Sequence, residues 1–172
     1  MVCNPYDQLN TFLVQAFQEI LREEESRICT GPFQNLSIRE MHLIEAVCCA
    51  CTEDGDNRSS AIAQRLHVTL STVTTSVNVL TRKGYLLRQR DPQDRRVARL
   101  LPTELGWQAN QIHQDFHRQM VAAVVDRLEE EELPVLVRAL SAITTYFTGE
   151  DLSPALEKEQ CHGHTNCNGQ HQ

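Results

Sequence analysis

The 172-residue sequence has no hydrophobic run approaching the ~20 residues that a membrane-spanning helix needs. Its first ten residues lack the basic and then apolar layout of a secretory signal. It also contains no phosphate-binding loop, nucleophile elbow or zinc-protease motif. We therefore predict a soluble, cytoplasmic protein that is not an enzyme and does not contact a membrane.

A paired cysteine framework is also missing, because the seven cysteines are odd in number and irregularly spaced. Reduced thiols in a cytosol fit this pattern better than disulfides do. Cys48, Cys49 and Cys51 cluster in one predicted helix. We interpret them as small buried hydrophobes, with a thiol-oxidation switch as the alternative.

Positive charge is scarce overall but concentrated in one segment. The net charge is −7, yet residues 58–99 contain nine basic and two acidic side chains. That segment therefore carries +7, which leaves −14 for the rest of the chain. Such asymmetry predicts a localised phosphate-binding surface that the total charge hides.

Hydrophobic periodicity indicates a mainly α protein with one small hairpin. A capping box of Ser37 and Glu40 opens the second helix, Ser59 or Ser60 is expected to cap the third, and Thr69 the fourth. Gly84 follows the fourth helix, where a positive φ is expected. The predicted elements are helices over 6–27, 37–50, 59–66, 69–83, 103–128 and 129–148, and strands over 85–90 and 97–101, joined by a turn at 91–94.

This order predicts a winged helix-turn-helix, in which the helix after Thr69 enters a major groove and the hairpin forms the wing. The groove-facing side chains are mostly hydroxyls, so we expect modest base reading and an A·T-rich site. The alternative is a plain helical hairpin in an α-bundle. The candidate DNA-contacting residues are Ser71, Thr72, Thr75, Ser76, Asn78, Arg82, Arg88, Arg90, Arg95 and Arg96.

Long apolar helices at both ends of the chain need a partner for their exposed faces. We predict a homodimer formed by residues 6–30 and 103–148, which flank the winged helix-turn-helix core at 36–102. Two-fold symmetry would place two recognition helices on a pseudo-palindrome in double-stranded DNA. Residues 149–172 are polar and are expected to form a disordered tail.

The sequence resembles the MarR family of regulators over about residues 6–148. The resemblance is carried by SSAIAQRLHVTLSTVTTSVNVLTRKGYLLRQR and by the wing segment DPQDRRVARLLPTELG. It implies that Asp94 orients Arg96, which contacts DNA, so Asp94 joins the candidate DNA site. Pro102 departs from the family pattern, which has an apolar strand residue there, and removes one hydrogen-bond donor.

Within that family the sequence is most similar to the fatty-acid-synthesis repressors of Gram-positive bacteria. The matching pieces are LSIREMHLIEAV, VTLSTVTTSVNVLTRKGY, DRRV and IHQDFHRQMV. The resemblance implies a repressor of lipid-synthesis genes that binds acyl-acyl carrier protein as corepressor, with the acyl chain in an apolar tunnel. Candidate lining residues, each of which can equally be plain core, are Phe12, Phe17, Met41, Ile44, Phe116 and Met120.

A rival interpretation is a zinc-responsive repressor of zinc-uptake genes in the same family. His113 and His117 are four residues apart on one helix face, a spacing that can chelate a metal. The resemblance to those sensors adds Glu24 and His42 to the candidate ligands. A second site of the sensors needs glutamates where this chain has Met41 and Ile112. The alternative to a metal site is that these histidines form hydrogen bonds between helices. We therefore expect that no cofactor is required, with zinc as a possible one.

The tail offers soft ligands at Cys161, His164, Cys167 and His171. Ordering an unstructured tail around a metal costs conformational entropy, so we expect weak or adventitious binding there.

Overall fold

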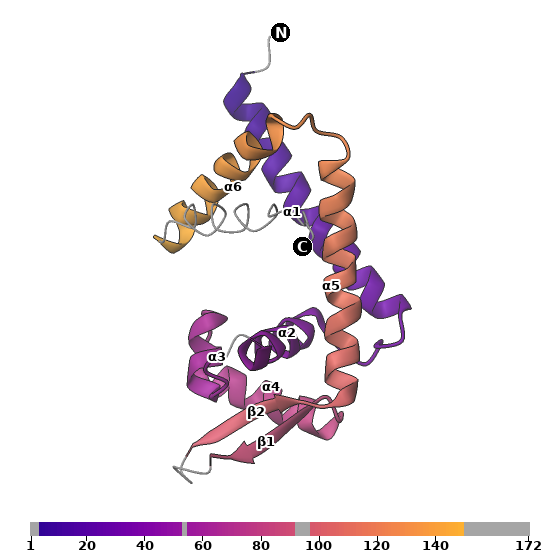
Figure 1. Ribbon diagram of the computed structural model, residues 1–172, viewed down its shortest axis with the longest axis vertical. Coiled ribbons are helices and arrows are strands. Elements are labelled where there is room, and N and C mark those ends of the chain that lie inside the picture. The colour runs from indigo at the N-terminus through magenta and orange to yellow at the C-terminus, as the bar shows by residue number, and fades with distance from the viewer. Residues whose placement is uncertain (1–3, 53–54, 92–96, 150–172) are drawn as a thin grey trace, which may run out of the picture. The chain divides into compact units, whose positions relative to one another are not determined.

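The computed structural model describes residues 4–52, 55–91 and 97–149 (Figure 1). The predicted turn at 91–94 beyond Asp91 and the predicted tail beyond Gly149 lie outside the described residues. The chain forms two compact units, residues 1–117 and 118–172, divided within α5. The elements are α1 (Pro5–Thr30), α2 (Ile38–Thr52), α3 (Ser59–Arg65), α4 (Leu70–Arg82), β1 (Leu86–Arg90), β2 (Ala98–Pro102), α5 (Glu104–Val125) and α6 (Glu132–Thr148).

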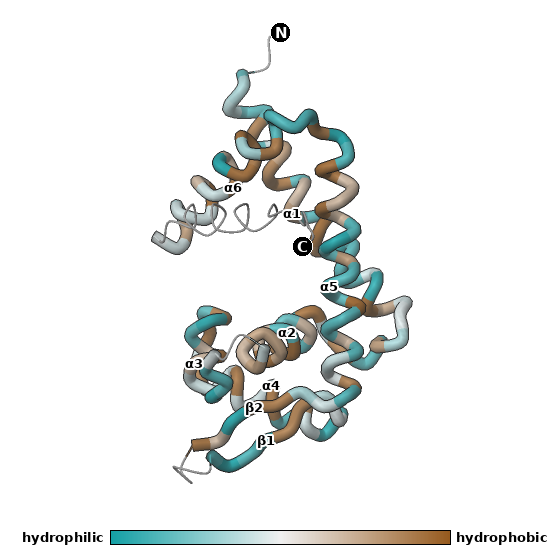
Figure 2. Tube along the Cα trace, viewed as in Figure 1, coloured by the Kyte–Doolittle hydropathy of each residue, from teal (hydrophilic) through white to brown (hydrophobic). Residues whose placement is uncertain are grey.

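The core of the first unit is built around α2, whose residues are largely hydrophobic (Figure 2). Ile44 and Val47 of α2 are fully buried. From α4, Val77 and Leu80 are also fully buried, as the i, i+4, i+7 spacing from Val73 predicts. The two strands add Leu86 and Leu100 to the same core. The apolar face of α4 therefore packs against the core, and its polar face is exposed to solvent.

The capping predictions are confirmed for α2 and α4. The backbone N–H of Ser37 donates to Glu40 Oε2 at 2.7 Å, and the N–H of Thr72 donates to Thr69 Oγ1 at 3.2 Å. The prediction that Ser59 or Ser60 caps α3 is wrong. The N-cap is Arg58, whose side chain makes no capping bond because a guanidinium has no acceptor atom. Asp56 Oδ1 accepts the backbone N–H of Arg58 at 3.0 Å.

The hairpin is antiparallel, with Leu86 opposite Pro102 and Arg90 opposite Ala98. Pro102 is the last residue of β2, where its missing N–H interrupts no further pairing. An isolated antiparallel β-bridge pairs Arg58, the N-cap residue of α3, with Arg99 of β2. Together with α2, α3 and α4, this hairpin forms the winged helix-turn-helix, so the predicted fold class is confirmed (Figure 1).

The second unit contains the end of α5 and all of α6. Helix α5 ends at Val125, three residues before the predicted end at Leu128. Glu132 Oε2 accepts the N–H of Glu129 at 2.9 Å ahead of α6, and Gly149 ends that helix with φ of +71°. No residue of α6 is buried, although the helix is rich in hydrophobic residues (Figure 2).

The start of α5 approaches the backbone before β1 so closely that only glycine fits. A Cβ at Gly106 would lie 2.4 Å from the Tyr85 carbonyl oxygen and 3.2 Å from Pro102 Cβ. That carbonyl is held in place, because it accepts the N–H of Thr103 at 3.0 Å.

We expect Gly106→Ala to lower the free energy of unfolding by about 1–3 kcal/mol, as overpacking of a rigid site does. Urea denaturation measures this. Gln108→Ala, on an exposed position of the same helix, is the control and should change stability by less than about 0.5 kcal/mol. Equal stability of the two variants would contradict the close approach.

Candidate functional site

The outer face of α4 carries the hydroxyl and amide side chains predicted to contact bases. Ser71, Thr72, Thr75 and Asn78 are exposed, and Ser76 is half-buried. The Thr69 hydroxyl lies 2.8 Å from the hydroxyls of both Ser71 and Thr72, which links the first turn of the helix into one hydroxyl cluster. We call the exposed residues Ser71, Thr72, Thr75 and Asn78 the recognition face.

Two arginines border the recognition face. Arg82 at the end of α4 and Arg88 on β1 line a shallow hollow together with Thr75 and Asn78. Arg88 Nη2 donates to the Thr74 carbonyl oxygen at 3.2 Å, which fixes its guanidinium beside α4. Arg90, two residues on, is also exposed. The hollow therefore combines hydrogen-bonding side chains with cations, as a surface that binds a DNA backbone and groove must.

Arg58, which the sequence placed in the basic segment but not among the candidate contacts, also lies beside Arg88. It lines a second cleft with Ser59, Ser60, Thr74 and Arg88. Its place at the N-cap of α3, inside the basic segment, was the signal that could have identified it.

Not all of the positive charge in residues 58–99 is available to phosphates. Arg58 pairs with Asp56, and this hydrogen-bonded partner lowers the pKa of Asp56 to about 2. Lys83 pairs with Glu40 at 2.8 Å, and Arg99 pairs with the buried Asp91 at 2.5 Å. The charge count of the segment therefore overstates its free cations.

Arg99 belongs to a network that anchors the wing to the loop before α3. Its Nη1 donates to Asn57 Oδ1 at 3.0 Å, and Asn57 Nδ2 donates to the Leu100 carbonyl oxygen at 3.0 Å. The N–H of Leu100 in turn donates to the Asn57 carbonyl oxygen at 2.9 Å. These contacts hold the base of the wing rigidly against the helical core. The predicted contact residues Asp94, Arg95 and Arg96 lie outside the described residues.

A second feature is an apolar pocket of about 270 Å³ at the end of α1. This volume is near the lower end of the range of about 300–1,000 Å³ for ligand pockets. It lies between the end of α1, the loop that follows it, α2 and α5. Its walls include Ile28, Phe33, Met41, Ile112 and Phe116 and the polar side chains of Glu24, Arg27 and His113.

Only two of the six predicted effector-contacting residues, Met41 and Phe116, line this pocket. Ile44 is fully buried in the core. On α1, Phe12 and Phe17 are 62% and 55% exposed. Met120 belongs to the second unit, where it is half-buried. Sequence periodicity marks all six as apolar, but it does not separate core, surface and pocket positions.

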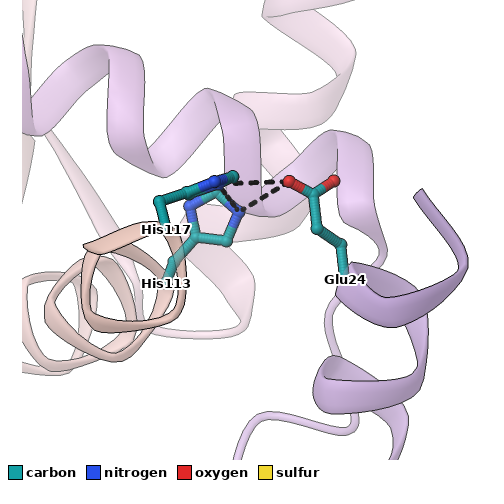
Figure 3. Close-up of side chains that lie close together, drawn as sticks. All are labelled: Glu24, His113 and His117. Carbon is teal, nitrogen blue, oxygen red and sulfur yellow. Dashed lines mark hydrogen bonds and ion pairs between the residues drawn. The ribbon is translucent and has the colours of Figure 1, made fainter. Parts of the chain in front are cut away.

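Glu24 of α1 and His113 and His117 of α5 point toward one another (Figure 3). Their ligand atoms all lie within 4.8 Å of one another. His117 Nε2 is 3.1 Å from Glu24 Oε1 and 3.3 Å from His113 Nε2. His42 on α2 adds a third imidazole, 3.7 Å from Glu24 Oε2. We call these four residues the Glu–His cluster, and the structure brings together all four candidate metal ligands.

The cluster has the chemistry of a zinc site. Glu24 and His113 are 4% and 5% exposed. Burial, followed by the nearby His117 and His42, lowers the pKa of His113 to about 4, so its ring is neutral at pH 7, as a ligand must be. Its Nδ1 is buried without a hydrogen-bond partner, and Glu45 Oε2 lies 3.6 Å away. A histidine that binds zinc through one ring nitrogen commonly donates the N–H of the other to a carboxylate, and Glu45 is in the position to accept it. The residues therefore fit zinc.

The pocket is connected to the recognition helix through the loop after α1. Phe33 of this loop packs edge-on against Tyr85, with ring centroids 6.0 Å apart. Asn35 accepts a hydrogen bond from the Tyr85 hydroxyl at 2.7 Å, and its carbonyl oxygen contacts Lys83 Nζ at the end of α4. Burial alone would raise the pKa of Glu40, but hydrogen bonds from Lys83 and Ser37 hold it below its usual value.

Of the three clustered cysteines of α2, Cys48 is buried as predicted, whereas Cys49 and Cys51 are half-buried. Cys48 is 1% exposed. Burial, together with the neighbouring Cys51, Cys49 and Glu45, raises the pKa of Cys48 to about 12, which leaves the thiol protonated and unreactive at neutral pH. This favours packing over an oxidation switch for Cys48.

Among the described helices, none combines the length and the apolarity required to cross a lipid bilayer.

Comparison with known proteins identifies the family. The model of the MarR family matches residues 48–98. The crystal structure of Streptococcus pneumoniae FabT in complex with DNA is 37% identical, covers 83% of this chain and 96% of that chain, and has a TM-score of 0.76. No curated protein matches the sequence.

Two more distant structures share the fold. The S. aureus MepR–DNA complex is 18% identical over 80% of this chain and 94% of that chain, with a TM-score of 0.65. A MarR family protein from Bacillus stearothermophilus is 20% identical over 83% of this chain and 95% of that chain, with a TM-score of 0.64. The family model and the FabT match together show that this chain belongs to the MarR family of DNA-binding winged-helix transcription regulators.

Proposed function

We propose that this regulator represses fatty-acid and phospholipid synthesis genes and responds to acyl-acyl carrier protein. The observation that carries the proposal is the 37% identity to FabT over 96% of that chain. The sequence segments shared with fatty-acid-synthesis repressors point the same way. The recognition face, rich in threonine methyl groups and hydroxyls, favours an A·T-rich operator.

The apolar pocket supports the proposal because most of its wall is hydrocarbon. Phe33 and Met41 on its wall are buried, and Phe33 belongs to the loop that contacts the end of α4 through Asn35. An acyl chain in this pocket can therefore bias the position of the recognition helix. It does so only to the extent that it binds the DNA-competent arrangement more tightly than the other.

A second copy of the chain completes the proposed regulator. Phe12, Phe17 and Leu21 on α1 are each more than half exposed, which is costly for large apolar side chains. Pairing of such faces across a two-fold axis buries them and places two recognition helices on a pseudo-palindrome.

The test is a gel-shift titration of the full-length protein on the promoter beside its own gene. We expect acylated carrier protein to tighten DNA binding and the unacylated carrier protein to have no effect. Ile112→Trp is expected to abolish the stimulation, because Ile112 lines the pocket and is 48% exposed, so the larger side chain can occupy the pocket without disrupting the core.

Leu105→Trp is the matched control, since Leu105 is an exposed residue of α5 that lines none of the pockets described above. It should retain the full response. Equal DNA affinity with acylated and unacylated carrier protein would overturn the proposal.

Zinc is a second candidate effector, favoured by the Glu–His cluster. The residues that would hold it are Glu24, His42, His113 and His117, with Glu45 behind His113. Zinc would supply a cation that ties α1 to α2 and α5. Because the cluster joins these helices, its occupancy is expected to change their spacing and thus DNA affinity. Zinc and chelator arms in the same gel-shift titration distinguish the two effectors.

A further inference from the structure

The apolar pocket and the Glu–His cluster share two side chains. Glu24 and His113 line the pocket, and both belong to the set of three ligand groups that lie within 4.8 Å of one another. The third member of that set, His117, does not line the pocket. One end of the hydrocarbon-lined cavity is thus a buried carboxylate facing imidazoles.

We propose that zinc in the Glu–His cluster and an apolar chain in the pocket bind cooperatively, so that each raises the affinity of the other. This inference rests on the proposed acyl-binding role of the pocket. The inference adds that a divalent metal regulates ligand binding in the pocket. The two candidate effectors would then act together on one regulator.

The sign of the coupling follows from the environment of Glu24. Described partners of its carboxylate are the rings of His42, His113 and His117, and its side chain is 4% exposed. An apolar chain in the pocket lies beside this carboxylate and offers it neither a hydrogen bond nor a countercharge, and a buried polar group without such compensation is costly. A bound dication supplies this compensation to Glu24. The apolar chain can then pack beside the carboxylate at a lower cost in free energy.

Geometry gives the same sign. Glu24 comes from α1 and His113 from α5, and their nearest ligand atoms are 3.9 Å apart. A metal that holds both side chains fixes two of the helices whose residues line the pocket. Fixing a pocket before its ligand arrives reduces the ordering cost of binding. By thermodynamic linkage, the apolar ligand must raise zinc affinity by the same factor.

The test uses the full-length protein and 11-(dansylamino)undecanoic acid as the apolar probe, titrated by fluorescence in saturating zinc or in chelator. We expect zinc to raise probe affinity by about tenfold, within the range of about 5–150-fold typical of coupled sites. The reciprocal titration, zinc with and without probe, should give the same factor. His117→Gln should keep the affinity measured in chelator and lose the zinc effect, because His117 is a cluster member outside the pocket.

Each other outcome overturns the coupling and identifies what failed. Equal probe affinity with zinc and chelator, with stoichiometric zinc bound, rejects the coupling and leaves the acyl response standing. Absence of zinc binding also rejects the coupling and leaves the acyl response standing. Failure of the probe to bind in either condition rejects the coupling and the pocket's proposed role together. A zinc effect that persists in His117→Gln rejects the cluster as its source.

Discussion

Replacing Arg88 by alanine is expected to weaken operator binding by about tenfold or more, the loss expected for one charged hydrogen bond of about 1.5–3 kcal/mol. Arg88 lines both hollows that flank α4, one with Asn78 and Arg82 and one with Arg58. Its Nη2 donates to the Thr74 carbonyl oxygen, so the guanidinium is positioned before DNA arrives. Because the Arg88 side chain is already ordered, a contact with the DNA backbone would cost little additional conformational entropy.

Salt dependence separates a phosphate contact from a base contact. If Arg88 neutralises a phosphate, the slope of log affinity against log salt falls by about 0.9 for each copy bound. The loss should then be similar on operator and on unrelated DNA, because phosphates carry no sequence information. Fluorescence anisotropy at several salt concentrations measures both quantities.

Arg22→Ala is the matched control for this variant. It removes the same charge from α1, where Arg22 pairs with Glu19 away from the recognition face. It should leave the affinity and the slope nearly unchanged. A change equal to that of Arg88→Ala would mean that only the net charge of the molecule matters, and an unchanged Arg88→Ala affinity would remove β1 from the interface.

The winged helix-turn-helix could be predicted from the sequence because its signals are local. The spacing of Val73, Val77 and Leu80, the cap at Thr69 and the box of Ser37 with Glu40 each act within one or two helical turns, and the structure confirms them. The cap of α3 was predicted wrongly, because helix propensity favours a serine N-cap and the helix instead begins one residue after Arg58, which cannot cap it.

The candidate sites depend on contacts between distant segments, and here prediction was uneven. The spacing of His113 and His117 identified half of the Glu–His cluster, but Glu24 and His42 came from family resemblance. The pocket could not be delineated from apolarity, since Phe12 and Phe17 are exposed while Phe33, which was not predicted, lines it. The pairing of Arg99 with Asp91 likewise required the folded hairpin.

Glu24→Gln is expected to be more stable than the wild type in chelator and less stable than the wild type in zinc, and this is the largest effect that the structure predicts for the cluster. In chelator, the wild-type protein buries the Glu24 carboxylate beside His113, whose ring is neutral at pH 7. Replacing this buried carboxylate by a neutral amide should stabilise the zinc-free protein by about 1 kcal/mol, because burying a carboxylate away from water is costly. The variant is isosteric, so packing is preserved.

In zinc the order should invert. Zinc at 100 times its dissociation constant stabilises the wild-type fold by about 2.7 kcal/mol. Loss of a residue that only supports a ligand weakens metal binding by about 10–100-fold. Loss of Glu24, a direct ligand, should weaken zinc binding by at least as much, so zinc stabilises the variant only a little. Urea denaturation of both proteins in zinc and in chelator measures the crossing.

Glu23→Gln is the control for this crossing, because Glu23 is an exposed neighbour that pairs with Arg27 at 3.1 Å and is not in the cluster. It should be stabilised by zinc as the wild type is. A wild-type protein that ignores zinc, combined with a Glu24→Gln variant that is less stable in chelator, would show that Glu24 acts as a hydrogen-bond acceptor for the histidines. The inverted order would instead show that the fold tolerates a buried charge because a cation compensates it.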